Sequence, residues 1–521
     1  MPSYKSPGVY VEEVEAGSRP IEGVGTAVAA FVGLAENGPY NAPTLVTNWS
    51  QYTREFGDFI DGSYLAHAVY AYFLNGGGAC YVVRIGAPAG AESGVSAVEG
   101  GRRGAKAALP AGPRVALDGF RVAALEGSGE GLVVEVADAG GESPAEEAFT
   151  LRVRRGEQVE ETFDVSAKRS QRSYVVTVVR ERSRLIVVEE AAPAGALARP
   201  GNQTVAVPPA PAPAAAQSEP TPGEYVGSAQ DRTGFAGLEA IDEITMLAVP
   251  DLMSAYERGA LDAEQVKAVQ LAMIAHCELM GNRIAILDPL PDLSPQQVKE
   301  WRQVGAGYDS KYAALYYPWI KVADPATKRN RFVPPSGAMA GVWARNDDTR
   351  GVHKAPANEV VRGAIELPVN LTKIEHDQLN PIGVNCIRFF PGRGIRVWGA
   401  RTLSSDASWR YLNVRRLFNY LEESILMGTQ WVVFEPNDDA LWARIRRTIS
   451  AFLVNEWRKG ALFGLTPDEA FYVKCDRETN PAEGIDAGEV VCEIGIAPVK
   501  PAEFVIFRLS QFSGGNSLVD E

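Results

Sequence analysis

Apolar β-branched runs alternate with helical spacings along most of this chain, and this pattern predicts an α/β body. Thr26–Gly33 and Cys80–Ile85 are strand candidates, and between them Tyr64–Leu74 carries large apolar groups at helical spacing. The alternation resumes in three further strand candidates, Ile244–Val249, Arg283–Leu287 and Tyr312–Tyr317. Because strands that alternate with helices join into βαβ units, a mixed and largely parallel sheet is expected.

Capping residues mark the helices of this body. Asp262 precedes an apolar stripe and Gly281 follows it, so a helix is predicted between them. Two more helical stripes are predicted near the end, Val414–Ile425 and Leu441–Leu453, the second behind an Asn437 cap.

The middle of the chain has a different pattern. Short alternating segments predict a separate all-β domain, inserted into the α/β body. Its strand candidates include Gly131–Val136, Phe149–Arg154 and Tyr174–Val179. The stretch from Ala191 to Gly223 is rich in Ala and Pro and poor in apolar bulk, which predicts a linker.

Both ends of the chain carry a strand pattern with no evident partner. The first is Val9, Tyr10 and Val11, behind Pro7-Gly8, and the second is Phe504, Val505, Ile506 and Phe507, behind Pro501. Because unpaired strand edges promote aggregation, a protein that carries two of them is expected to use them on another chain. Polymerisation is therefore the first hypothesis.

Composition narrows the classes of function. The chain has 521 residues and a formal charge of -14, which argues against general binding to nucleic acid or to an anionic membrane. The N-terminus lacks a signal-peptide core, and no run of about 18 apolar residues occurs, so the chain is expected to stay where it is made and not to insert into a membrane. Five widely spaced cysteines without a C-x-x-C pair suit reduced thiols.

Candidate catalytic groups are few. Asp251 and Asp288 follow predicted parallel strands, where α/β enzymes place functional residues, but both stand beside proline and are interpreted as turn residues. The four histidines have no metal-binding spacing, and the glycine clusters match no phosphate-binding loop. No catalytic residue, cofactor or metal is predicted, and an α/β enzyme is the least favoured alternative.

Several longer strings are specific enough to suggest a family. They are Pro7–Glu13, Thr26–Gly33, Tyr316–Trp319, Val333–Gly337, Ala355–Asn358 and Arg396–Leu403. Together they resemble the phage tail sheath family, whose members belong to contractile phage tails, pyocin-like particles and contractile injection systems. The similarity covers both ends and the α/β body, and it is loose between about Gly86 and Gly223.

The resemblance implies a structural subunit, not an enzyme. It implies hexameric rings of this same protein, stacked helically around an inner tube, with baseplate and terminal cap proteins as further partners. It also implies assembly in the bacterial cytoplasm, with release by lysis as one option. In such sheaths the terminal strands add to a small sheet in neighbouring subunits, and contraction drives the tube through a target envelope.

The division expected from these patterns has seven segments. They are an N-terminal arm (1–22), a first core segment (23–87), an outer β-rich insertion (88–190), a linker (191–230), a second core segment (231–390), a tube-proximal domain (391–498), and a C-terminal strand and tail (499–521). The fold class is α/β (α+β) and multidomain, with extended terminal β-arms.

One basic surface stands out in this acidic chain. At about 100° per residue, Arg444, Arg447 and Arg458 fall on the side of the last predicted helix that faces away from its apolar stripe. They are candidates for contact with the inner tube, and the alternative is a solvated helix face.

A second interpretation of the whole protein is an adhesive or receptor-binding particle protein that uses the inserted β-domain.

Overall fold

The computed structural model divides the chain into two units, residues 1–86 with 219–521, and residues 87–218. The described residues are 20–86, 115–118, 120–124, 132–139, 147–155, 158–169, 171, 173–183, 185–190, 199–207, 220–325 and 327–509. Each unit has its own hydrophobic core.

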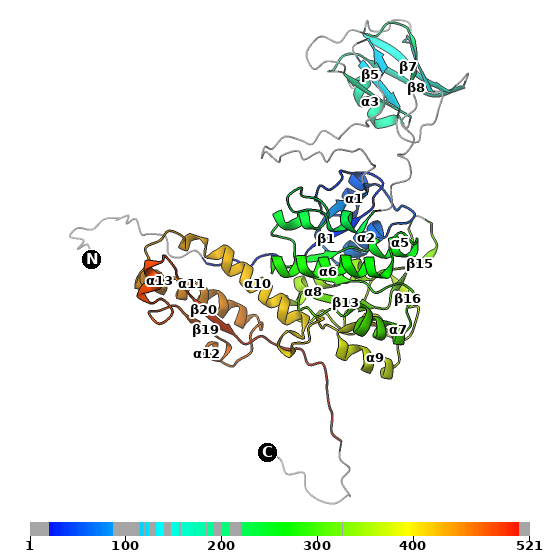
Figure 1. Ribbon diagram of the computed structural model, residues 1–521. Helices are drawn as coiled ribbons and strands as arrows, with labels where there is room; N and C mark the ends of the chain where they lie inside the picture. Colours follow the sequence, from blue (N-terminus) through cyan, green and yellow to red (C-terminus); the bar gives the residue numbers. More distant parts are fainter. Residues whose placement is uncertain are drawn as a thin grey trace, which may run out of the picture. The chain divides into compact units, whose positions relative to one another are not determined.

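The first unit is built on an eight-stranded sheet (Figure 1). Its strands in spatial order are β18 (Gly394–Val397), β17 (Val384–Phe390), β13 (Ala313–Tyr317), β12 (Ile284–Leu287), β11 (Met246–Ala248), β1 (Val28–Gly33), β3 (Ala79–Arg84) and β2 (Thr44–Val46). The five central pairs are parallel and the outermost pair on each side is antiparallel. The predicted mixed, largely parallel sheet is confirmed.

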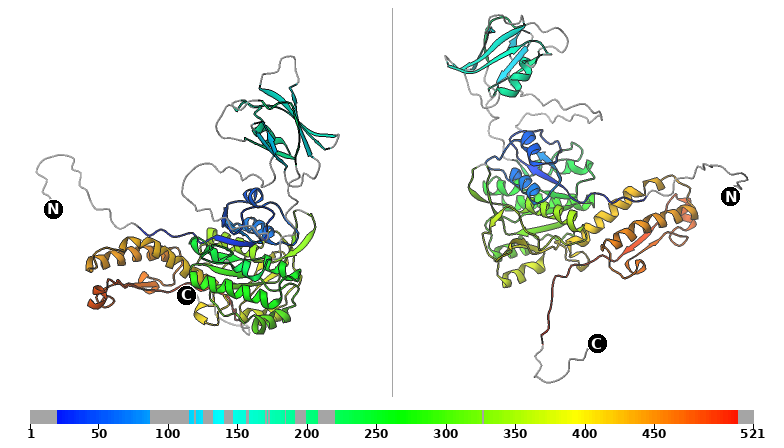
Figure 2. Two further views of the ribbon diagram at one scale, coloured as in Figure 1. Left: turned by 45° about the horizontal axis from the view of Figure 1, so that its top comes forward. Right: turned by 180° about the vertical axis from the view of Figure 1, so that it is seen from behind.

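Helices cover both sides of this sheet (Figure 2). They are α1 (Trp49–Phe56), α2 (Leu65–Asn75), α4 (Pro222–Val226), α5 (Asp251–Glu257), α6 (Ala263–Met280), α7 (Pro295–Glu300), α8 (Ser336–Arg350) and α9 (Lys373–Leu379). As predicted, α6 begins behind Asp262, whose side chain accepts a hydrogen bond from Gln265 N, and ends at Gly281. A small antiparallel sheet lies beside the body and consists of β15 (Asn330–Val333), β14 (Ile320–Ala323) and β16 (Ala364–Glu366).

Close packing of α2 against α8 explains one glycine cluster. A Cβ added to Gly337 would lie 2.4 Å from Ala68 Cα, and one added to Gly341 would lie 2.4 Å from the Tyr72 carbonyl oxygen. No larger side chain fits at either position. The glycines therefore let two helices touch, and they do not form a phosphate-binding loop.

The C-terminal region of the first unit forms a lobe with its own apolar cluster. Its elements are α10 (Leu412–Gly428), α11 (Asp439–Arg458), α12 (Pro467–Ala470), β19 (Phe471–Lys474), α13 (Ala482–Asp486) and β20 (Glu493–Ile496). The predicted Asn437 cap of α11 is wrong, because Asp438 is the residue that accepts from Leu441 N, at 2.8 Å. Asn437 instead accepts from Trp442 Nε1 and donates to the Glu489 carbonyl.

The second unit combines two antiparallel sheets and a helix. One sheet holds β4 (Val115–Leu117), β5 (Phe120–Ala124) and β9 (Ile186–Glu190), and the other holds β10 (Thr204–Val207), β6 (Leu132–Asp138), β7 (Ala148–Arg155) and β8 (Gln158–Ser166). The helix is α3 (Val175–Arg182). The predicted strands at Gly131–Val136 and Phe149–Arg154 correspond to β6 and β7.

Two expectations for this unit are wrong. Tyr174–Val179 is not a strand and the domain is not all-β, because the segment lies at the start of α3, which buries Val175 and Val179 on one side. Packing of that i, i+4 pair overrides the β-propensity of valine. The predicted linker 191–230 also contains β10 of this unit, which pairs with β6 and buries Val207, and α4 of the first unit, which buries Tyr225.

Candidate assembly surfaces

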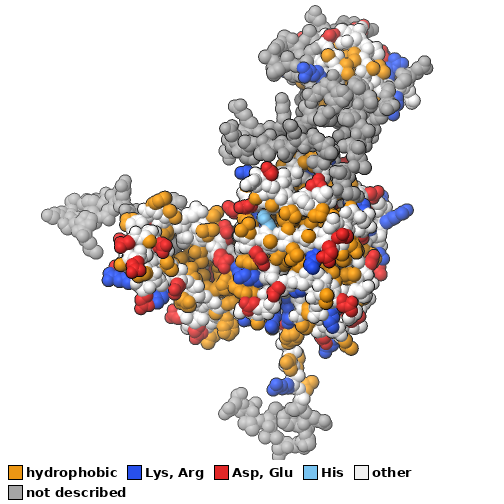
Figure 3. All heavy atoms as spheres, in the orientation of Figure 1, with side chains coloured by type: hydrophobic (Ala, Val, Ile, Leu, Met, Phe, Trp, Pro, Cys, Tyr) orange, Lys and Arg blue, Asp and Glu red, His pale blue; other side chains and the backbone are white. Residues whose placement is uncertain are grey.

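Of the two terminal strand candidates, the structure describes the C-terminal one, Phe504–Phe507. Residues 504–509 have no backbone hydrogen bond to any other described segment. The side chains of Phe504, Val505, Ile506 and Phe507 are exposed by 71%, 68%, 79% and 84%. Figure 3 shows orange, hydrophobic side chains along the extended segment below the body. A stretch of apolar side chains on unpaired backbone has what strand addition to another chain requires.

A buried ion pair fixes the root of this segment. Arg401 Nη2 lies 2.6 Å from Glu503 Oε2, and the two side chains are exposed by only 9% and 18%. Arg401 Nε and Asn380 Nδ2 donate to Glu503 Oε1 at 2.9 and 2.7 Å, and the Tyr411 hydroxyl donates to Oε2 at 3.2 Å. Burial alone would raise the pKa of Glu503. These donors stabilise the charged carboxylate more strongly, so the pKa lies below its usual value. The packed body therefore ends at Glu503.

The N-terminal strand candidate, Val9, Tyr10 and Val11, lies outside the described residues, whereas the segment that follows it is held along α10. The Ile21 side chain is buried against Gly428, where an added Cβ would lie 2.6 Å from Ile21 Cγ1. Val24 N donates to Ser424 Oγ at 3.1 Å. The chain thus reaches the sheet by running beside this helix.

A second buried ion pair completes this attachment. Thr26 Oγ1 donates to Asp347 Oδ2 at 2.7 Å, and Arg416 Nη2 donates to the Thr26 carbonyl at 3.0 Å. Arg416 and Asp347 also pair with each other, and both side chains are 4% exposed. One stretch of chain, residues 401–424, supplies Arg401, Tyr411, Arg416 and Ser424. This stretch therefore holds the points at which both terminal segments leave the packed body.

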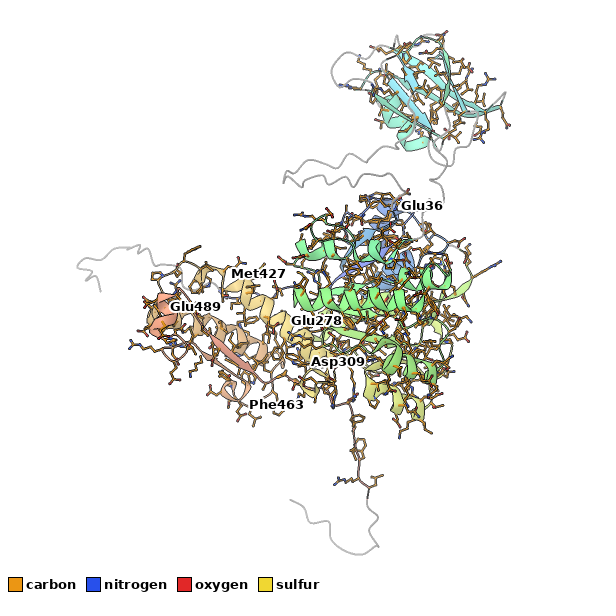
Figure 4. All side chains as sticks on the ribbon, viewed as in Figure 1. Glu36, Glu278, Asp309, Met427, Phe463 and Glu489 are labelled. Atoms are coloured by element: carbon orange, nitrogen blue, oxygen red, sulfur yellow. The ribbon has the colours of Figure 1, made fainter. Side chains whose placement is uncertain are left out.

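Among the described residues, the sheet of β19 and β20 has two strands, with Phe471 opposite Ile496 and Lys474 opposite Glu493. Two-stranded sheets are marginally stable alone and leave both edges available for further strands. Apolar side chains stand exposed around it, with Tyr472 at 59%, Phe463 at 73% and Leu465 at 90%. Figure 4 shows Phe463 at the end of the lobe opposite Glu489.

The three arginines of the predicted basic surface are exposed on α11. Arg444 lies over the Trp431 ring at 4.5 Å and is 3.4 Å from the Glu435 carboxylate, so some of its charge is balanced within the chain. Arg447 Nε donates to the Ala443 carbonyl of its own helix.

The two carboxylates at the strand ends cap helices. Asp251 is fully buried after β11 and accepts hydrogen bonds from Leu34 N, Tyr64 N, Leu65 N and Ser63 Oγ. Burial raises the pKa of Asp251 to about 6, against the effect of these donors. Its carboxylate accepts from the first backbone N–H groups of α2, so its hydrogen bonds are all used within the fold.

Asp288 has the same kind of role. It lies buried after β12 and accepts a hydrogen bond from Ser336 N at the start of α8, at 2.9 Å. Burial raises its pKa to about 7. His67 and His276 are also buried, and burial lowers the pKa of each to about 4. Among the described residues, no cluster of three or more potential metal ligands is found.

Comparison with known families decides what this architecture is. The family model described as the phage tail sheath protein central domain matches residues 234–403, and that of the phage tail sheath C-terminal domain matches residues 404–512. The matched ranges adjoin and cover more than half of the chain. This chain belongs to the phage tail sheath family. The sequence-based assignment is confirmed.

Curated relatives agree with this assignment. A tail sheath protein of Vibrio phage KVP40 is 33% identical over 35% of this chain, a match that spans 27% of that phage protein. A tail sheath protein of Burkholderia phage BcepMu is 24% identical over 98% of both chains.

Solved sheath structures share the fold. The sheath of the anti-feeding prophage in its contracted helical state has a TM-score of 0.59 and 24% identity, covering 98% of this chain and all of the other. The contracted sheath of PVC, an extracellular contractile injection system, has a TM-score of 0.58 and 23% identity, covering 98% and 99%. The two family models identify the chain as a tail sheath protein, and these structures show that it shares the sheath fold.

The structure adds a feature that the sequence did not indicate. The attachment of both terminal segments to residues 401–424 involves two ion pairs, Arg401 with Glu503 and Arg416 with Asp347, and the partners in each pair are far apart along the chain. No spacing rule connects them. The only local sign is the charge of Glu503, directly before the apolar run Phe504–Phe507. No helix in the described portion of the chain is long and apolar enough to cross a membrane.

Proposed function

We propose that this sheath subunit polymerises by exchanging its terminal strands with copies of itself. The observation that carries the proposal is the exposed apolar run Phe504–Phe507, which starts directly after an anchor buried in the body. Six residues from 504 to 509 span about 20 Å when extended, enough for one strand of a small sheet. Val9, Tyr10 and Val11 form the matching N-terminal strand in this scheme.

The acceptor in the neighbouring copy is the β19–β20 sheet. It has two strands and exposed apolar side chains around it, so it gains both main-chain hydrogen bonds and buried area when strands are added. Main-chain pairing tolerates changes in side-chain contact. Such joints keep subunits connected while the bodies rotate between the extended and the contracted arrangement.

The assembled particle has further partners in this proposal. The subunits form hexameric rings around an inner tube, with Arg444, Arg447 and Arg458 of α11 facing the tube, and baseplate and cap proteins close the two ends. Assembly takes place in the bacterial cytoplasm.

Contraction releases free energy that is stored in the extended polymer. This release drives the tube through a target envelope and requires no nucleotide.

Deleting residues 1–20 and imaging the product by electron microscopy tests the proposal. The full chain should form ridged tubules on inner tubes, and the deletion should stay folded by circular dichroism but fail to form them. Tubules of normal length from the deletion would reject strand exchange at that end. Contraction that required added ATP would reject the stored-energy scheme.

A further inference from the structure

Two of the five cysteines face each other at one end of the β19–β20 sheet. Lys474 lies opposite Glu493 in the antiparallel register, so the next position along the two strands pairs Cys475 with Cys492. Their thiols are close enough to interact directly. Directly opposed residues have Cα atoms about 4.5–5.5 Å apart, which falls inside the range of about 4.4–6.8 Å that disulfides require.

The chain between the two cysteines is already closed by a buried side chain. Asn480 Nδ2 donates to the carbonyls of Asp476 and Val491, each at 3.0 Å, and its Oδ1 accepts from Val491 N at 2.6 Å. Arg446 of α11 donates to the Cys475 carbonyl. Asn480 Nδ2 also lies 3.8 Å from Cys475 Sγ. The backbone on both sides of the cysteine pair is therefore held mainly by main-chain contacts of Asn480 and Arg446.

The remaining cysteines have no such partner. Cys80 lies opposite Ala29 and Val46, and Cys386 lies opposite Tyr317, while Cys277 is on α6. All three are fully buried. Cys492 is partly exposed, so a small oxidant reaches this pair first.

We propose that Cys475 and Cys492 are a disulfide site that closes the end of the β19–β20 sheet under oxidising conditions. The oxidant is a small disulfide such as oxidised glutathione. The Cys492 thiolate attacks it, forming a mixed disulfide and releasing one small thiol, and the Cys475 thiolate then displaces the second. Two electrons pass to the small disulfide, and the two cysteine protons end on the two released thiols.

Burial sets the rate of this reaction. It raises the pKa of both thiols, that of Cys492 to about 12, so only a small fraction is thiolate at neutral pH. Oxidation is therefore slow in a cell, where small thiols also reverse it, and goes forward in solution outside a cell. If β19–β20 is the strand acceptor of the proposed function, the disulfide keeps its two strands together while neighbours pull on them.

The test uses the purified full chain, incubated with oxidised glutathione at pH 7 and pH 8.5 and then digested without reduction. We expect a peptide linked between Cys475 and Cys492, formed about tenfold faster per pH unit. We also expect the melting temperature to rise by about 5 °C and to return when dithiothreitol is added. Neither readout requires assembly, so failure here is distinct from failure of the proposed polymer.

Matched variants complete the experiment. Cys492→Ser should abolish the linked peptide and the thermal shift, whereas Cys277→Ala should keep both. The proposal is overturned if the folded protein forms no such link in a buffer that oxidises the urea-unfolded chain. It is also overturned if the thermal shift persists in Cys492→Ser.

Discussion

Replacing both Phe504 and Ile506 by aspartate should weaken each junction between subunits. The two side chains share one side of an extended segment, and they are 71% and 79% exposed in the single chain. Burying a whole Phe or Ile side chain is worth about 1.5–3 kcal/mol, so burying these exposed fractions together contributes about 2–4 kcal/mol. The loss corresponds to a roughly 30- to 1,000-fold weaker junction.

The measurement is the lowest protein concentration at which tubules sediment on inner tubes. This concentration should rise strongly for the double variant, while its thermal unfolding stays unchanged because neither side chain packs on the body. Leu279→Asp is the matched control, since that residue is 76% exposed on α6, away from the proposed joint. The Val505 and Phe507 pair, on the other side of the segment, should be tested in parallel. Normal assembly of both double variants would refute the role of the segment.

Three further outcomes are expected. Reversing the charges of Arg444, Arg447 and Arg458 together should reduce binding to inner tubes, and unchanged cosedimentation would remove the proposed tube contact. Glu503→Ala should lower the free energy of unfolding by about 2 kcal/mol in urea titrations, because Arg401 keeps a buried charge without its carboxylate. Asp288→Asn should raise the melting temperature at pH 8 but not at pH 4. The raised pKa of Asp288, about 7, means that its contribution to stability is complete below about pH 4 and is lost as the pH rises to 7.

Hydrophobic periodicity predicted the body well because its strands are buried on both faces. β1, β12 and β13 appear in the sequence as continuous apolar runs, and α6 carries a cap at each end. Where tertiary packing competes with local preference, the prediction was wrong. The valines of α3 favour a strand by propensity, but β8 and β9 offer an apolar surface that a helix covers with Val175 and Val179.

The assembly surfaces were only partly predictable. An apolar run is a local pattern, so the exposed segment Phe504–Phe507 could be located from the sequence, while its use as an exchanged strand stays a prediction. The contacts of Arg401 with Glu503 and of Arg416 with Asp347 depend on the folded path of the chain, and so does the meeting of Cys475 with Cys492. The basic face of α11 followed from helical geometry, whereas the position of Arg444 over Trp431 did not.

The attachment of both terminal segments to residues 401–424 defines a short route for mechanical force. In a polymer joined at its ends, tension that enters one subunit through its first residues leaves through its last ones by way of α10, a helix of 17 residues and about 25 Å. None of the anchoring residues Arg401, Asp347, Arg416 and Glu503 belongs to a strand of the eight-stranded sheet. In a sheath built in this way, tension between subunits would pass mainly through α10 and its contacts, and the larger part of each subunit would bear little of it.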